Sequence, residues 1–235
     1  MSAGITSSSN SIREYVDLKT VNKDLANENA RLKALLYKKI LANDPSNISV
    51  ADSSQIKKYN FITSKVINNS TNKFHNYLTI NKGWADSIAP GMGVICPTGV
   101  VGKVKSCSKN FSTIVSLLHK DMLISSKLKS SNSIGTTHWE GMDPTKAMLV
   151  YIPRHIKVKK GDIVVTSEYN SVFPEGEMIG KLETIKVKGD DNFYNLTMKL
   201  STDFSSLSYV YVVKNKLKIE QDSLEMLIKG DNESK

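Results

Sequence analysis

The chain has 235 residues, of which 40% are hydrophobic and 23% charged, a balance typical of a globular protein with one large or two small domains. A net charge of +9 raises the question of nucleic acid as a partner, but the basic residues are scattered and form no basic helix or stripe. Two cysteines, Cys96 and Cys107, cannot supply a disulfide framework or the paired thiolates of a zinc site. We therefore expect no nucleic-acid partner and two reduced thiols.

Residues 12–43 have the pattern of a coiled-coil helix. Ser11 and Glu14 have the spacing of a capping box, which satisfies free amides at a helix start. A heptad pattern follows, with position d occupied by Leu18, Leu25 and Leu32 and position a by Asn22, Asn29 and Leu36. These six residues predict a parallel dimer. The alternative is an amphipathic helix that packs on its own domain, because Val21 and Leu35 widen the apolar stripe.

After Pro45 the helical period ends and short segments of β type follow. Runs such as 77–80, 113–118 and 209–213 are rich in β-branched and aromatic residues and lie between Gly, Pro, Asn and Asp. This predicts a mainly β fold with an N-terminal α-helix, in which a coiled-coil helix precedes two small β-barrel domains. The expected divisions are a flexible start 1–11, a helix 12–43, a first β domain 44–142, a second β domain 143–213 and a charged, disordered tail 214–235.

A faint internal repeat supports two related β units. Residues 90–95 and 99–104 are similar in pattern to residues 160–165 and 176–182, and Asn-Phe follows each copy. Glycines in such places allow a positive φ or a sharp bend at a barrel corner. We therefore interpret the glycines as structural, with Gly102 and Gly180 at the expected bends.

The sequence lacks recognisable motifs for chemistry. No metal-ligand spacing links its four histidines, which are His75, His119, His138 and His155. We expect no metal and no cofactor. His119, Asp121 and Ser167 have the residue types of the catalytic triad of a two-barrel serine protease. Ser167, however, has no flanking glycines that could form an oxyanion hole. Trp139 could stack on a sugar or, more commonly, close a barrel end. We predict no catalytic residue and no enzymatic activity.

Six glycine-containing motifs resemble the rod shape-determining protein family MreC in order and spacing. They are residues 77–83, 88–95, 99–104, 161–167, 173–176 and 179–180. The helix before them, with residues 25–32, is similar to the juxtamembrane coiled coil of that family, and Glu168 departs from the glycine that the family usually carries. The turn residues that these motifs assign a structural role are Gly83, Pro90, Gly91, Gly93, Gly99, Gly102, Gly161, Asp162, Thr166, Ser167, Phe173, Pro174, Gly176 and Gly180.

The resemblance implies a non-catalytic periplasmic scaffold of the elongasome, whose β domains are similar to two-barrel serine proteases without working active sites. Such a protein organises and activates peptidoglycan synthases for lateral cell-wall growth and cell shape, and is anchored in the inner membrane by a span absent from this chain. The implied partners are the protein itself, as a homodimer or filament, the class B penicillin-binding transpeptidase and RodA, with MreD, RodZ and MreB directly or indirectly. The alternative function is an envelope serine hydrolase or a peptidoglycan-binding module.

Overall fold

The computed structural model describes residues 18, 20–37, 59–169, 172–187, 192–218 and 220. They form an N-terminal helix over residues 18 and 20–37, a short 3-10 helix and twelve β-strands. These elements are β1 (Tyr59–Asn69), β2 (His75–Ile80), η3 (Trp84–Asp86), β3 (Gly93–Cys96), β4 (Gly99–Cys107), β5 (Ser112–His119), β6 (Ile124–Leu128), β7 (Ile134–His138), β8 (Lys146–Pro153), β9 (Ile163–Thr166), β10 (Met178–Lys186), β11 (Phe193–Leu200) and β12 (Tyr209–Asn215). The predicted mainly β fold with an N-terminal helix is confirmed. The predicted helix start and most of the predicted tail 214–235 lie outside the described residues, but Lys214 and Asn215 belong to β12, so the predicted disorder is wrong for these two residues.

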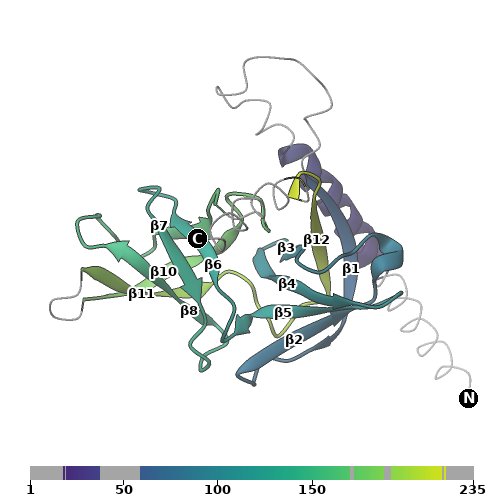
Figure 1. Cartoon of the computed structure of the whole chain (residues 1–235), viewed down its shortest axis with the longest axis horizontal. Helices are drawn as coiled ribbons and strands as arrows, with labels where there is room; N and C mark the ends of the chain where they lie inside the picture. The colour runs from purple at the N-terminus through teal and green to yellow at the C-terminus, as the bar shows by residue number, and fades with distance from the viewer. Residues whose placement is uncertain are drawn as a thin grey trace, which may run out of the picture.

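The strands close into two barrels that lie side by side (Figure 1). The first barrel has the strand order β1-β12-β3-β4-β5-β2, and the second has the order β10-β11-β8-β7-β6-β9. Neighbouring strands are antiparallel throughout both barrels. Closure gives every edge strand a partner, so neither sheet presents an open edge to another chain.

The two barrels share one topology but exchange one strand. Their strand orders coincide when β1 to β5 are matched with β7 to β11 and β12 is matched with β6. Each unit of five consecutive strands is therefore closed by the sixth strand that a tandem arrangement would place in the other barrel. The expected domain division at residues 142 and 143 does not coincide with the barrels, because β6 and β7 precede it and belong to the second barrel, whereas β12 belongs to the first.

The internal repeat is visible in the backbone hydrogen bonds. The glycine turn makes the same backbone hydrogen bond in each copy. The Gly91 amide donates to the Val104 carbonyl oxygen at 2.8 Å, and the Gly161 amide donates to the Leu182 carbonyl oxygen at 2.8 Å. β4 bulges against β3 at Val101, and β10 bulges against β9 at Ile179. The predicted bends therefore occur at the same place in both copies.

Gly102 and Gly180 follow these bulges, but a positive φ is not the reason why these two positions require glycine. Positive φ angles occur at other glycines, among them Gly91, Gly99, Gly161 and Gly176. A Cβ atom on Gly102 would lie 2.0 Å from the carbonyl oxygen of Val115, and one on Gly180 would lie 2.3 Å from that of Lys199. The neighbouring strand approaches too closely for any side chain at either position.

Strand periodicity fills the barrels with apolar side chains. In β11, the alternate residues Leu196 and Met198 are completely buried. Trp139 is buried and donates its indole N–H to the carbonyl oxygen of Asp143 at 2.8 Å, so it is a core residue and not a sugar platform. Cys96 is buried and Cys107 is half-buried, and both thiols are free.

Candidate interaction surfaces

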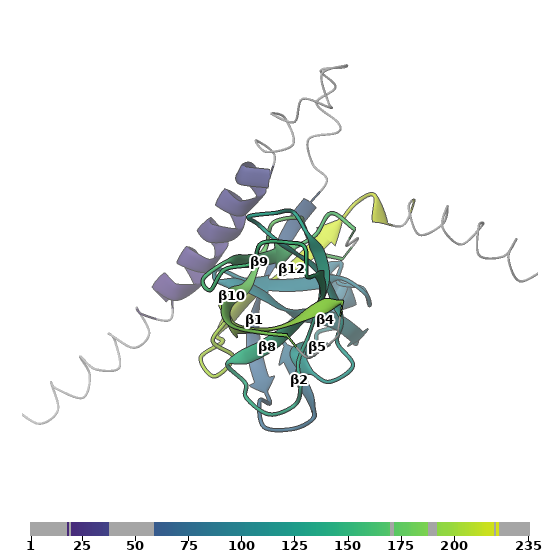
Figure 2. The same cartoon turned by 90° about the vertical axis from the view of Figure 1, so that its left-hand side faces the viewer.

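The N-terminal helix lies along the first barrel (Figures 1 and 2). Its contact face carries Ala26 and Ala30, which are 5% and 6% exposed and belong to the hydrophobic core. Small side chains allow the helix backbone to approach the sheet closely. At the end of this face the Tyr37 ring packs against Phe61 at 5.8 Å between ring centroids. The helix thus packs on its own domain, as one alternative predicted, but through alanines and not through Val21 and Leu35.

A buried ion pair fastens the same helix to the second barrel. Lys33 Nζ lies 2.8 Å and 3.0 Å from the two carboxylate oxygens of Glu177, and the Tyr37 hydroxyl donates to the same carboxylate at 2.8 Å. The Glu177 side chain is only 4% exposed. Burial, and then the neighbouring carboxylate, raise the pKa of Tyr37 well above its usual range, so the tyrosine stays a hydrogen-bond donor. Because Glu177 directly precedes β10, the helix bridges the two barrels.

The predicted dimer leucines point away from the barrels. Leu18, Leu25, Leu32 and Leu36 are 50% to 58% exposed, and Val21 and Leu35 are 51% and 49% exposed. The two asparagines assigned to position a are also exposed, but the Asn29 amide hydrogen-bonds to the buried Tyr211 of β12. We name the exposed residues Leu18, Val21, Leu25, Leu32, Leu35 and Leu36 the leucine stripe. The stripe lies beside the alanine face, and Asn29 lies between the two.

The second barrel carries an aromatic groove of about 540 Å³. Its lining residues come from the crossover before β6 and from β7, β8 and β11, and they are Leu123, Thr136, His138, Val150, Tyr151, Asn192, Phe193, Tyr194 and Asn195. The rings of Tyr151 and Phe193 meet edge to face at 6.0 Å, and these residues are 62% and 43% exposed. Exposed aromatic pairs of this kind are common at protein interfaces.

A β-bulge turns Tyr151 outward. Val150 and Tyr151 of β8 lie opposite the single residue Asn195 of β11, since Leu149 pairs with Leu196 and Ile152 with Tyr194. Tyr151 takes φ +66, which is rare for a bulky residue. Bulges of this type re-aim side chains at functional sites, and their backbone strain persists only where the fold imposes it.

The turn residues predicted from the sequence occupy three kinds of place. Gly91, Gly99, Gly161 and Gly176 have positive φ. Asp162 accepts the Lys159 amide in a turn, and Pro90 lies exposed before β3. Close backbone approaches explain Gly83 and Gly93, where a Cβ would lie 2.0 Å from Ser108 O and 2.5 Å from Val172 O. Gly99 combines both reasons, since a Cβ there would also lie 2.3 Å from Met178 O. The last two approaches join the two barrels.

Thr166, Ser167, Phe173 and Pro174 form one buried turn structure. The Thr166 hydroxyl donates to the carbonyl oxygen of Pro174 and accepts the Glu177 amide at 2.9 Å. Glu168, which departs from the family pattern, binds Lys127 at 2.8 Å, and Lys127 also binds Glu175. Lys127 lowers the pKa of Glu168, so the carboxylate stays ionised. The departure is therefore accommodated by an ion pair.

The proposed serine-protease triad is not assembled. The Ser167 hydroxyl is fully buried and lies 2.7 Å from that of Ser125. His119 Nε2 instead lies 3.1 Å from the Tyr77 hydroxyl, while its Nδ1 accepts the Asp121 backbone amide at 3.1 Å. Burial, with a smaller contribution from His75, lowers the pKa of His119.

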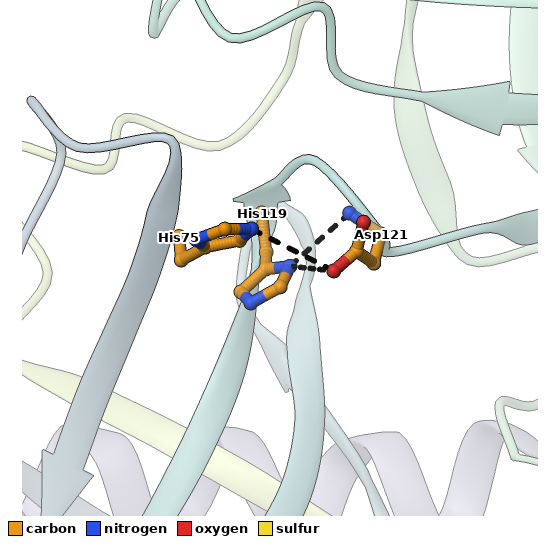
Figure 3. Close-up of side chains that lie close together, drawn as sticks. All are labelled: His75, His119 and Asp121. Carbon is orange, nitrogen blue, oxygen red and sulfur yellow. Dashed lines mark hydrogen bonds and ion pairs between the residues drawn. The ribbon is translucent and has the colours of Figure 1, made fainter.

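Figure 3 shows that His75 and Asp121 lie close to His119. His75 pairs with His119 across β2 and β5, and their rings lie 4.7 Å apart. Asp121 Oδ2 lies 3.7 Å from His75 Nε2 and 3.9 Å from His119 Nδ1. Sequence spacing did not reveal this cluster, because only the strand register brings His75 to His119.

Comparison with known proteins decides the family. Residues 66–214 match the family model for the rod shape-determining protein MreC, barrel core. The chain belongs to the MreC family. Cell shape-determining protein MreC of Bacillus subtilis is 32% identical over 221 residues, which cover 84% of this chain and 73% of the relative. MreC of Listeria monocytogenes is 27% identical over 206 residues, which cover 86% of this chain and 65% of the relative, so the chain spans about two thirds of that relative's length.

Solved MreC structures share the fold. One from Listeria monocytogenes superposes with a TM-score of 0.63 at 27% identity, and covers 87% of this chain and 92% of that chain. A complex between penicillin-binding protein PBP2 and MreC from Helicobacter pylori contains a chain with a TM-score of 0.54 and 14% identity, covering 68% of this chain and 99% of that chain. The family assignment from the glycine motifs is confirmed. MreC is a cell shape-determining protein with a periplasmic domain, and the family is non-catalytic, so the hydrolase alternative is set aside.

The described residues include no helix that is long and apolar enough to cross a membrane.

Proposed function

We propose that this chain is a periplasmic scaffold of the elongasome, anchored in the inner membrane in its full-length form, which organises and activates peptidoglycan synthases during lateral wall growth. The observation that carries the proposal is the aromatic groove of the second barrel. Tyr151 is held outward by a bulge and a positive φ, and it is 62% exposed beside Phe193, which is 43% exposed. Strained backbone of this kind clusters at binding and active sites, which supports a binding role for the groove.

The occupant that we propose for the aromatic groove is the class B penicillin-binding transpeptidase. The groove is apolar at Leu123, Tyr151 and Phe193 and carries asparagine amides at its rim. A partner that inserts apolar side chains between the two rings would gain burial there, and the amides would satisfy its backbone polar groups. RodA would be reached through the transpeptidase, and MreD, RodZ and MreB through the membrane part of the assembly.

The leucine stripe supports a homodimer, but with a seam that differs from the predicted one. The Asn29 side chain is engaged with Tyr211 of its own barrel, so we place it outside the seam. Leu18, Val21, Leu25, Leu32 and Leu35 are exposed and lie on one side of the helix. They form a seam with Leu18, Leu25 and Leu32 at one heptad position and Val21 and Leu35 at the other, where Glu28 is the charged residue between them. We propose that two copies pair in parallel through this seam.

A binding experiment with matched variants tests the aromatic groove. Tyr151→Ser and Phe193→Ser should weaken binding of the purified periplasmic part of the transpeptidase by roughly thirty-fold each, since interface anchors contribute about 2 kcal/mol or more. Phe111→Ser removes an aromatic side chain of similar exposure, 48%, from the first barrel and should leave affinity unchanged. If Tyr151→Ser and Phe193→Ser bind as tightly as the parent, the groove assignment is wrong. If Phe111→Ser loses affinity as well, the interface is distributed or the variants are misfolded, and circular dichroism distinguishes these two causes.

A further inference from the structure

His75, His119 and Asp121 present three metal-ligand atoms to a common point (Figure 3). One ring nitrogen from each histidine and one carboxylate oxygen of Asp121 all lie within 4.8 Å of one another. Two separations are already 3.7 Å and 3.9 Å. Zinc bonds of about 2.0 to 2.2 Å in a tetrahedron place ligand atoms roughly 3.3 Å apart, so small side-chain rotations would complete the geometry.

Two of the three ligand side chains are exposed, and the third is buried and held in place. His75 and Asp121 have side chains 58% and 78% exposed, so they are free to rotate toward an ion. His119 is only 7% exposed and is held by Tyr77. A buried histidine that anchors a site with two adjustable exposed ligands is a workable arrangement for a surface metal ion.

The hydrogen bonds of His119 leave Nδ1 unprotonated, as a metal ligand requires. Its Nδ1 accepts the backbone amide of Asp121, so the ring proton resides on Nε2 and is donated to the Tyr77 hydroxyl. Lys105 also donates to that hydroxyl, at 3.0 Å, which leaves the phenol oxygen as the acceptor. Metal-bound histidines characteristically donate their other N–H in this way. An ion at Nδ1 would displace the Asp121 amide, which lies in an exposed connection and would hydrogen-bond to water.

We propose that His75, His119 and Asp121 form a binding site for a divalent transition-metal ion, of which Zn²⁺ fits the two imidazoles and one carboxylate best. Three protein ligands leave the fourth tetrahedral position for water or for a group of a partner protein.

The position of the site indicates what a bound ion would do. His75 begins β2 and His119 ends β5, both in the first barrel, while Asp121 lies in the crossover from β5 to β6 of the second barrel. An ion would therefore tie the crossover to the first barrel and restrain one of the two chain connections between the barrels. It would stabilise the arrangement of the barrels by the free energy of binding.

The test is zinc titration of the tag-free chain by calorimetry, together with thermal melts in zinc chloride. We expect one ion per chain and, at a hundred-fold excess over the dissociation constant, a rise in the unfolding midpoint of roughly 5 to 10 °C. His75→Ala and Asp121→Asn change exposed side chains and should abolish the rise while leaving the melt without zinc unchanged. Tyr77→Phe, which removes the acceptor for Nε2–H, should weaken binding on the order of ten-fold.

The matched controls are the two histidines outside the cluster. His138→Ala and His155→Ala should bind zinc as the parent does. Absence of saturable binding at 100 µM zinc would overturn the proposal, as would binding that survives in both His75→Ala and Asp121→Asn. These two variants decide the outcome, because their side chains are exposed and their replacement leaves the barrel core intact, whereas replacing the buried His119 would also disturb packing.

Discussion

Replacing Gly102 by alanine tests whether close strand approach or backbone conformation makes the barrel glycines necessary. The new Cβ would lie 2.0 Å from the Val115 carbonyl oxygen, well inside a normal carbon–oxygen contact of about 3.3 Å. β4 would have to move away from β5 by more than an ångström at the place where Gly102 pairs with Ser116. Overpacking costs about 1 to 3 kcal/mol, and each weakened ladder hydrogen bond adds about 1 kcal/mol.

The expected total is about 3 kcal/mol, which corresponds to a fall in the unfolding midpoint of roughly 6 to 12 °C for a chain of this size. Gly161→Ala is the matched control, because a Cβ there meets nothing within 4 Å but must adopt φ +91. That strain costs about 1 to 2 kcal/mol.

Substitution by asparagine distinguishes steric overlap at Gly102 from backbone strain at Gly161. Asn tolerates a left-handed backbone better than Ala, so Gly161→Asn should melt above Gly161→Ala, whereas Gly102→Asn should recover nothing relative to Gly102→Ala. The assay is differential scanning calorimetry of the four variants and the parent. A Gly102→Ala midpoint within a degree of the parent, or partial recovery in Gly102→Asn, would refute the steric argument.

Three further predictions concern the helix and the ion pairs. Leu25→Ser should shift the dimer to monomer in light scattering, whereas Asn29→Ala should not, because Asn29 serves its own barrel. Lys33→Met leaves the Glu177 carboxylate buried without its cation, which should destabilise the protein by roughly 2 to 4 kcal/mol and increase hydrogen exchange in the helix. Glu168 has a pKa held below 4.5 by its lysine partner, so its stabilisation is present above pH 4.5 and lost as the pH falls through the folded-state pKa. Glu168→Gln should therefore flatten the fall in the unfolding midpoint between pH 6 and pH 3.5, and an unchanged slope would contradict this.

Local features were predictable from the sequence because they depend on neighbours in the chain. The glycine turns and the repeat both follow from short-range backbone geometry. The positions of the leucine and alanine faces on the helix likewise follow from the spacing of these residues along the sequence. Sequence patterns showed where the leucines recur, but they could not show that the alanine face and Asn29 would be used by the barrel.

Features that depend on register and topology were not predictable. The exchange of β6 and β12 between barrels leaves no local signal, because both are ordinary short β segments. The same holds for Lys33 and Glu177, which are separated by 144 positions, and for the cross-strand pair of His75 and His119. The repeat correctly indicated two units, and only the pairing of the last strand could reveal that their boundaries are interleaved.

The interleaving couples the barrels and the helix into one structure. The first barrel cannot close until β12 arrives, and β12 pairs Asn215 with Tyr59 only after the whole second barrel has been synthesised. Pairing over such a separation carries a large loop-closure cost, which the compact second barrel reduces by bringing its two connections close together. The helix then contacts the finished first barrel through Ala26 and the start of β10 through Glu177. In the proposed scaffold, this assembly would hold the leucine stripe and the aromatic groove at a fixed separation, so a partner bound at the groove would be positioned relative to the axis of the proposed dimer.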